Sequence, residues 1–470
     1  MEDKNGKTKR TPHKWEAFSA LILVILGVTL GTRFGIEIGT VLVLCSVYVI
    51  IIGFRCGYSW SELEQGIMEK IIDVIPVFFI LLGIGFLIST WMFAGTIPTA
   101  IYYLVKVINP KFVVIFSFLV CAVVSTIIGT SWGTAGTIGV VMIGLAQVVG
   151  APMPVVAAAI ICGSHYGQLC SPMSDMVAIT SRIAEVEPID MVKRSMLVVI
   201  PSTVISLILY GFLGMNGVGA GGNAESVQLM LDGIRGIFNV NPIVLIPLAF
   251  IIFASVKKWP TAPSMFASGF IAIALGVIFN GFSIGDGLTA GFNGFDIAMT
   301  GMQSENVMPE IASLVSRGGM QTMSYTIILL FCAMFFTGTL SKIGCLDVIV
   351  KALFSNVNKI GPLYFASIIT SFITAVTTLQ AYLAVIVPSE LLKDKYVDNG
   401  YAPINMAVAV QTVGAIIMPL FAWGDTGLYM SSVTGVPTMS FLPYAFFCWG
   451  TALVGLVMAF LGIGVKKIEK

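Results

Sequence analysis

The chain has 470 residues, of which 57% are hydrophobic and only 10% are charged, and its mean hydropathy is +0.96. Soluble domains carry about 25% charged residues, so this composition excludes an ordinary water-soluble protein. The formal net charge of +1 gives no basis for nucleic-acid binding through bulk electrostatics.

A basic tail, residues 1–14, precedes the first apolar stretch. It resembles the start of a signal peptide, but many apolar segments follow and no small-residue cleavage site is visible, so we expect an uncleaved first helix. Three lysines stand in the last segment, residues 466–470. Because basic flanks favour the cytoplasmic side, the sequence predicts two cytoplasmic tails and a multi-pass protein of the cell membrane.

Long apolar segments recur along the chain, and several approach the roughly 20 residues that span a bilayer as a helix. Backbone groups in lipid need partners within the segment, so segments of this length predict a helical bundle rather than a barrel. The expected fold is therefore an all-α polytopic membrane protein. The segments are Phe18–Leu30, Ile36–Phe54, Val74–Ile88, Phe112–Ile128, Met196–Leu213, Val244–Val256, Met265–Phe279, Ile327–Gly338, Pro362–Val376 and Phe446–Ile463.

Polar stretches broken by Gly and Pro interrupt this pattern twice in each half of the chain. In the first half they are Gly129–Gly139 (GTSWGTAGTIG) and Gly163–Asp175 (GSHYGQLCSPMSD). In the second half they are Thr374–Ala384 (TAVTTLQAYLA) and Gln411–Gly427 (QTVGAIIMPLFAWGDTG). Apolar segments interrupted at corresponding places are typical of inverted-repeat transporters, which bind substrate near the bilayer midplane.

The matching order predicts two transmembrane repeats, residues 15–213 and 242–465, joined by a Gly-rich linker at residues 214–241. Markers in the two halves are offset by about 242 to 248 residues, which is consistent with an old duplication. An odd number of crossings in each repeat gives the repeats inverted topologies. A polar surface stretch in the second repeat predicts a short amphipathic helix around Pro309–Arg317.

The first polar stretch of each half offers oxygen ligands beside a backbone that leaves helical geometry. The candidate residues are Thr130, Ser131 and Thr134 in the first half and Thr377, Thr378 and Gln380 in the second. Such re-entrant hairpins or broken helices bind Na⁺ through hydroxyl and carbonyl oxygens, or a carboxylate at a half-helix N-terminus. The alternative is that small hydroxylated residues only let helices pack closely.

The second polar stretch of each half contains an acid, Asp175 in the first and Asp425 in the second. An acid at membrane depth is costly and usually marks an ion or proton pathway, so both are candidate Na⁺ sites. For Asp175 the alternative is an interfacial charge near a loop. Polar neighbours of Asp175 complete the predicted site: His165, Gln168, Ser171 and Ser174.

Other classes of function lack their signatures. An enzyme would need a nucleophile with a base or a metal cluster, an ATP-driven pump a P-loop, and a channel rings of like charge. We therefore expect a secondary active transporter that works by alternating access, with Na⁺ and/or H⁺ as coupling ions and no cofactor. Its expected partners are lipid, a small cation, and a small organic carboxylate or amino acid, with a homodimer as an open option.

Five stretches together resemble the NhaC family of Na⁺/H⁺ antiporters, in the wider ion-transporter superfamily that includes dicarboxylate carriers. They are LISTWMFAGTIPTAIYY (Leu87–Tyr103), GTSWGTAGTIG, YGQLCSPMSD, SRGGMQTM (Ser316–Met323) and PLFAWGDTGLYM (Pro419–Met430). The resemblance implies an inverted-repeat fold and cation-coupled secondary transport.

The chain departs from the family pattern where acids are expected. Gln168 stands where the family's FGDKMSPLSD pattern has an acid, and Gln411 and Thr412 stand in place of an acidic pair. Asp425 is an acid where the family's PWNTCG pattern often has threonine. A neutral amide can bind Na⁺ but cannot carry a proton, so the alternative is a Na⁺- or H⁺-coupled carrier or exchanger of a small organic acid, of malate/lactate type, or of an amino acid.

Overall fold

The computed structural model describes residues 9–217, 224–302, 307–346, 348–349 and 359–468. In these ranges the regular structure is helical, and the only β pairing is an isolated bridge between Tyr401 and Lys467. Ten of the described helices are long and apolar enough to cross a membrane, or up to 13 if each bent pair forms one span. The all-α polytopic fold is thereby confirmed.

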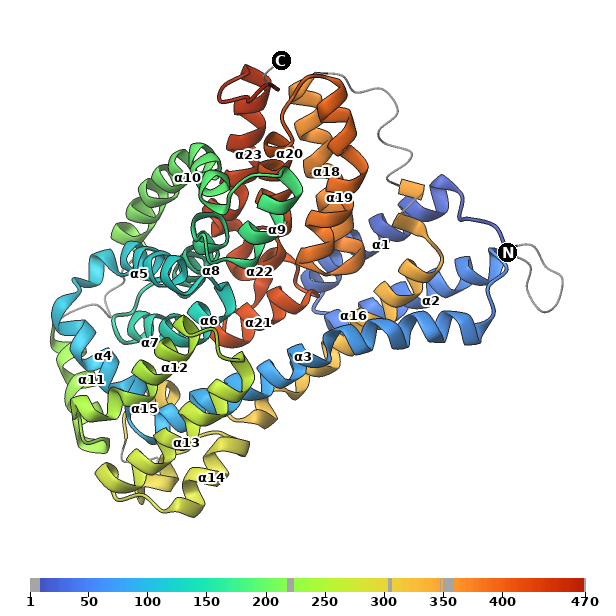
Figure 1. The fold of residues 1–470 in the computed structure, drawn as a ribbon. Helices are drawn as coiled ribbons and strands as arrows, with labels where there is room; N and C mark the ends of the chain where they lie inside the picture. The colour runs from blue at the N-terminus through green and yellow to red at the C-terminus, as the bar shows by residue number, and fades with distance from the viewer. Residues whose placement is uncertain (1–8, 218–223, 303–306, 347, 350–358, 469–470) are drawn as a thin grey trace.

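A long helix, α3 (Trp60–Phe93), forms one side of the molecule. At about 1.5 Å per residue its 34 residues exceed the ~30 Å bilayer core, and Pro76 interrupts its hydrogen bonding. The backbone N–H of Ser59 donates to Glu62 Oε2 (3.0 Å) and caps its start. In Figure 1, α3 runs beside α16 (Ser324–Lys342), which also packs on α2 (Ile38–Arg55).

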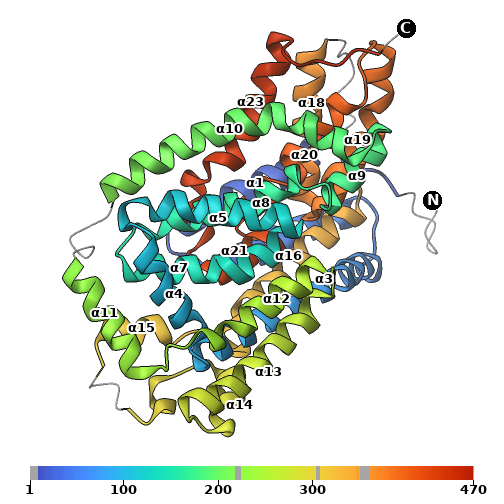
Figure 2. The same ribbon diagram turned by 60° about the vertical axis from the view of Figure 1, so that its left-hand side comes forward.

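Two further groups of helices complete the body. In the first half, α5 (Val113–Ile128) packs along α8 (Met153–Cys170), and α10 (Pro188–Gly217) crosses them (Figure 2). The second half supplies a second bundle that α10 joins through α23. Its helices are α18 (Ile360–Thr378), α19 (Ala381–Asp398), α20 (Ile404–Gly414) and α23 (Phe446–Leu461).

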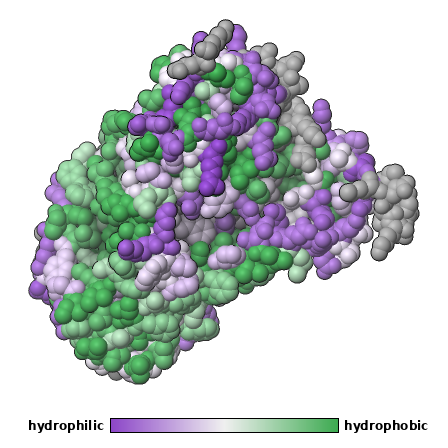
Figure 3. All heavy atoms as spheres, in the orientation of Figure 1, coloured by the Kyte–Doolittle hydropathy of each residue, from purple (hydrophilic) through white to green (hydrophobic). Residues whose placement is uncertain are grey.

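Helices at the lower end of Figure 1 carry much of the exposed apolar surface. Figure 3 shows this lobe as largely hydrophobic, whereas hydrophilic residues gather over the middle and right of the same face. Exposed side chains such as Phe270, Ile278 and Phe292 lie on α13 and α14 and suit contact with lipid. The remaining longer helices are α1 (Lys14–Arg33), α4 (Thr96–Val107), α12 (Ile246–Val256), α13 (Thr261–Asn280) and α14 (Ile284–Asn293).

The predicted linker and the polar stretch of the second half also contain helices. α15 (Pro309–Val315) confirms the short helix expected near residue 309. The stretch interpreted as the linker holds α11 (Ala224–Ile237), and α10 extends to Gly217, four residues beyond the predicted end of the first repeat. The repeat boundaries therefore stay predictions.

Short helices follow the chain breaks and meet in the centre. After α5 the chain continues through α6 (Ser131–Thr134), a π-helical turn (Ala135–Gly139) and α7 (Val140–Val148). The other short helices are α9 (Asp175–Ala184), α21 (Asp425–Thr434) and α22 (Thr438–Phe441). α7 and α21 lie side by side in both ribbon views.

The two halves repeat the same local geometry at an offset of 250 residues. Gly129 and Leu379, which follow α5 and α18, both adopt left-handed conformations, with φ of 84° and 54°. Asp175 and Asp425 each begin the short helix after the second break. A leucine held at positive φ is strained, so its recurrence at the position of a glycine supports the expected duplication.

Candidate ion- and substrate-binding site

The breaks of the two halves meet around one cavity of about 450 Å³, within the range of small-ligand pockets. We call it the acidic cavity because three carboxylates line it. Its polar lining consists of Asp73, Thr130, Ser131, His165, Gln168, Asp175, Thr261, Gln380, Tyr382, Asp425 and Thr426, and Trp132 and Met418 are among its larger side chains.

Asp425 is positioned by the start of α21. Its Oδ1 accepts hydrogen bonds from the backbone N–H of Thr426 (2.5 Å) and from the Thr426 hydroxyl (3.1 Å). The partial positive charge at a helix N-terminus stabilises a carboxylate there. This arrangement holds the acid in place and leaves Oδ2 available to an ion in the cavity.

Asp175 occupies the equivalent position at the start of α9 and is more exposed than Asp425. Ser174 caps this helix by accepting a hydrogen bond from the Met176 N–H (3.2 Å). Both acids line the same cavity, together with Tyr382. The structure therefore brings the two predicted acids, 250 residues apart, to one space.

His165 lines the cavity from α8 and is almost fully buried. Its Nδ1 lies 2.9 Å from the carbonyl oxygen of Ile161. Because a carbonyl only accepts, Nδ1 donates, and in the neutral ring Nε2 is then an acceptor. Such a nitrogen can take up a proton or face a cation.

Gln168 connects the two broken regions of the first half. Its Nε2 donates to Ser131 Oγ (3.0 Å), and its Oε1 accepts from Ser174 Oγ (3.1 Å). Gln411, on α20, donates from Nε2 to the Gln168 backbone carbonyl (3.1 Å) and accepts from Ser195 Oγ (3.1 Å). The two amides thus form a hydrogen-bonded network between the two halves of the chain.

In the second half the residue at the break is Gln380, directly after Leu379. Its Nε2 donates to Asp73 Oδ2 (3.2 Å), which also pairs with Lys70 (3.0 Å). Thr130, 250 residues earlier, occupies the equivalent place in the first half and also lines the cavity. One amide and one hydroxyl therefore face the cavity from corresponding positions.

The other predicted hydroxyls do not line the cavity. Thr377 and Thr378 donate to carbonyls of their own helix, at Ile373 (2.8 Å) and Thr374 (2.7 Å). Thr134 and Thr412 do the same within their helices. Ser171 accepts from the backbone of its own turn, and Ser174 acts through its cap and Gln168.

Five polar or aromatic lining residues were not among the predicted site residues: Asp73, Trp132, Thr261, Tyr382 and Thr426. Asp73 stands three residues before Pro76, and that pairing of an acid with a helix-breaking proline is the signal that could have found it. Thr426 directly follows the predicted Asp425 and donates to it. The contact of Trp132 with Tyr429 joins the two halves, which sequence spacing does not reveal.

Trp132, which lines the cavity, packs against Tyr429 of α21. Their rings stack with centroids 4.4 Å apart and planes 10° apart, and the Tyr429 hydroxyl donates to the Trp132 carbonyl (2.8 Å). A Cβ atom at Gly136 would lie 2.4 Å from that hydroxyl, so only glycine permits this approach. The contact ties the broken helix of the first half to that of the second.

Within the described residues no group of three or more His, Cys, Asp or Glu side chains lies close enough to hold a metal ion. A cation in the acidic cavity would therefore need hydroxyl, amide or carbonyl oxygens besides the carboxylates.

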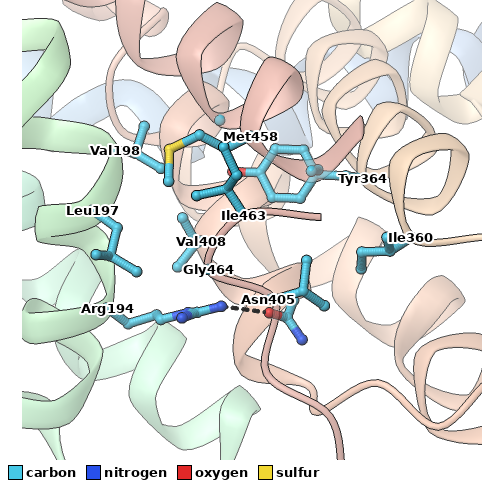
Figure 4. A pocket seen from close by; sticks show the side chains of 13 residues that line it. Arg194, Leu197, Val198, Ile360, Tyr364, Asn405, Val408, Met458, Ile463 and Gly464 are labelled. Atoms are coloured by element: carbon cyan, nitrogen blue, oxygen red, sulfur yellow. Dashed lines mark hydrogen bonds between the residues drawn. The ribbon is translucent and has the colours of Figure 1, made fainter. Parts of the chain in front are cut away.

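A much smaller cavity of about 30 Å³ lies where Arg194 Nη2 donates to Asn405 Oδ1 (2.8 Å), shown in Figure 4. Its size suits a water molecule but no organic solute.

Comparison with known proteins decides the family. A model of the Na⁺/H⁺ antiporter family matches residues 167–463, well over half of the chain. The chain belongs to the Na⁺/H⁺ antiporter family. A model of the C4-dicarboxylate anaerobic carrier matches residues 3–213. The protein is thus a multi-pass secondary transporter of the antiporter type and not an enzyme.

Individual members of the Na⁺/H⁺ antiporter family and its neighbours align over nearly the whole chain. An uncharacterized Na⁺/H⁺ antiporter of Haemophilus influenzae is 32% identical and covers 98% of both chains. The Na⁺/H⁺ antiporter NhaC of Alkalihalophilus pseudofirmus is 28% identical over 96% of both. The malate-2H⁺/Na⁺-lactate antiporter of Bacillus subtilis is 27% identical over 94% of both. The similarity therefore includes both cation and organic-acid antiporters.

Proposed function

We propose that the protein exchanges Na⁺ for H⁺ across the cell membrane, with Asp175 and Asp425 as the cation-binding acids. The observation that carries this proposal is that the two acids begin equivalent helices and line one cavity. The similarity to Na⁺/H⁺ antiporters supports it. Na⁺ and H⁺ are then the coupling ions, and no resident cofactor takes part.

In this proposal Na⁺ and H⁺ are exchanged because they compete for the same carboxylate. A carboxylate that binds a proton loses the charge that attracts Na⁺, so one site holds one ion or the other. Asp425, fixed by Thr426, offers one oxygen to the cavity, and Thr130 and Ser131 add hydroxyl oxygens of the kind that hard cations prefer. The acceptor nitrogen of His165 offers a second place for a proton.

Alternating access needs a barrier that opens on one side at a time. The stacked Trp132 and Tyr429 fill this role in the proposal, because they join the broken helices of the two halves beside the acidic cavity, which Trp132 lines. Relative movement of the halves would separate the rings and open the other side. Cytoplasmic placement of both tails, inversion of the two repeats and a homodimer stay predictions within this proposal.

The test is a flux assay in proteoliposomes with a trapped pH-sensitive dye and a jump in external Na⁺. We expect proton movement in the wild type and none in Asp425→Asn, with Asp175→Asn strongly impaired. Asp190→Asn is the matched control, because Asp190 lies on an exposed face and pairs only with Lys193 (3.0 Å). Proton movement that survives in both cavity variants would overturn the proposal.

A second candidate function is cation-coupled exchange of a small organic acid or amino acid. The observation that favours it is the neutral network of Gln168 and Gln411 where the family carries acids, which leaves fewer groups to move protons. The similarity to the malate/lactate antiporter supports it. In the same assay, no response to Na⁺ alone but a response after addition of malate, lactate or an amino acid would select this function.

A further inference from the structure

A second large cavity, of about 470 Å³, lies at the far end of the same broken helices. α6 and α7 carry Trp132 in the acidic cavity and Val140 and Gly144 in this one. α21 likewise carries Thr426 in the first and Ser431 in the second. We call it the arginine cavity. Its lining includes Ile88, Arg317, Gly318, Tyr325, Leu428 and Ser431.

The charge of this cavity is opposite to that of the first. Among the described residues that line it, Arg317 is charged and none is Asp or Glu. The Arg317 Nη2 donates to the neutral Gln147 Oε1. Tyr325, another lining residue, donates from its hydroxyl to Glu37 Oε2 (2.6 Å). A partly buried guanidinium is costly in a membrane protein and is usually functional.

The backbone after Arg317 is held tightly in place. Gly318 and Gly319 adopt φ of 77° and 95°, and the Gly319 N–H donates to the Gly85 carbonyl on α3 (2.7 Å). A Cβ atom at Gly318 would lie 2.5 Å from the backbone nitrogen of Ser89. The SRGGMQTM stretch thus uses two glycines to press this loop against α3, which fixes the position of Arg317.

We propose that the arginine cavity binds the carboxylate of a small organic anion through Arg317. A guanidinium binds a carboxylate through two parallel hydrogen bonds, and the hydroxyl of Ser431 can donate to a further oxygen. Ile88 and Leu428 offer apolar surface to a short carbon chain. The volume suits a ligand of a few carbon atoms.

This inference deepens the second candidate function, because it names small carboxylates as the substrate class and gives them a site apart from the cation-binding acids. A lipid headgroup or free phosphate has related anionic chemistry, and the test separates these sources. Carboxylate binding and Na⁺-dependent proton movement are measured separately on the wild type, so that either proposal can fail without the other.

The experiment is calorimetric titration of the purified full-length protein with L-malate, with lactate and with inorganic phosphate. Arg317→Gln removes the charge. Arg317→Lys keeps the charge but loses the planar guanidinium that can form two parallel hydrogen bonds. Arg194→Gln is the matched control, since Arg194 is also partly buried and bonded to an amide oxygen, beside a cavity too small for the ligand.

We expect malate or lactate to bind the wild type and the control equally, with Kd at least about tenfold higher in Arg317→Gln and an intermediate value in Arg317→Lys. If Arg317→Gln does not fold, weaker binding by Arg317→Lys carries the same result. Unchanged affinity in a folded Arg317 variant would overturn the proposal. The proposal would also be overturned if inorganic phosphate bound with the same affinity as the carboxylates. It would equally be overturned if the protein bound carboxylates in vesicles of zwitterionic lipid but not in vesicles of anionic lipid, because a lipid headgroup would then occupy the site.

Discussion

The acidic cavity and the arginine cavity have nearly the same volume, about 450 and 470 Å³, but their linings have opposite charge. The first gathers Asp73, Asp175 and Asp425, and the second has Arg317 and no acid among the described residues that line it. Residues of α7 and its preceding turns and of α21 contribute to both linings. In our proposals these two spaces of similar size bind chemically different ligands, cations in the first and anions in the second.

The largest expected effect comes from removing the charge of the acidic cavity. Asp425→Asn should reduce Na⁺-driven proton movement to the level of empty vesicles, because an amide cannot exchange a proton for Na⁺. The dye assay in proteoliposomes measures this. Asp190→Asn should behave as wild type, and equal loss in that variant would show that the effect is not specific to the cavity.

The next effect tests the contact between the two broken helices. In Gly136→Ala the new methyl group would lie 2.4 Å from the Tyr429 hydroxyl and force the helices apart, at a cost of about 1–3 kcal/mol in free energy of unfolding. Thermal unfolding of the purified protein measures it. Gly236→Ala on α11 is the control, since no atom lies within 4 Å and alanine favours helix by up to about 1 kcal/mol. A Gly136→Ala variant as stable as wild type would contradict the close packing.

A smaller effect is expected when one more carboxyl group is added to the acidic cavity. Gln168→Glu adds a titratable group beside Ser131 and Ser174, whose hydroxyls can both donate to it. We expect more protons moved per Na⁺ and a steeper dependence of transport on pH. Gln228→Glu, on the exposed part of α11, serves as control. A pH profile of Gln168→Glu that superimposes on the wild type would count against a proton path near residue 168.

The smallest effect concerns the hydroxyls of the arginine cavity. Ser431 lines this cavity from α21. Ser431→Ala should weaken carboxylate binding by about threefold to tenfold, the equivalent of one hydrogen bond of roughly 0.5–1.5 kcal/mol. Calorimetric titration measures it, with Ser440→Ala at an exposed position of α22 as control. Unchanged or tighter binding by Ser431→Ala would contradict the assigned role.

The sequence predicted the helical membrane fold and the two acids because both depend on local patterns. Uninterrupted apolar segments require helices, and Asp175 and Asp425 stand out beside Pro172 and Pro419. The place of Asp73 in the cavity was not predicted, because it depends on contact with Gln380, 307 residues away.

Of the three candidates predicted at the second-half break, Gln380 lines the cavity but Thr377 and Thr378 do not. A run of threonines indicates polar character but not where the helix ends, and Thr377 and Thr378 satisfy their hydroxyls within α18. The helix ends at Leu379, whose left-handed conformation no propensity favours. Similarly, the SRGGMQTM stretch was noticed as a motif, but only the packing of its glycines on α3 reveals the cavity that Arg317 lines.

The most direct test of the account is proton release by the purified protein in weakly buffered detergent solution when Na⁺ is added. If Na⁺ and H⁺ compete for Asp425, the wild type releases protons in proportion to bound Na⁺, and Asp425→Asn releases none above the level seen with choline. Equal proton release by wild type and Asp425→Asn would contradict the assignment of the acidic cavity as the site of cation exchange.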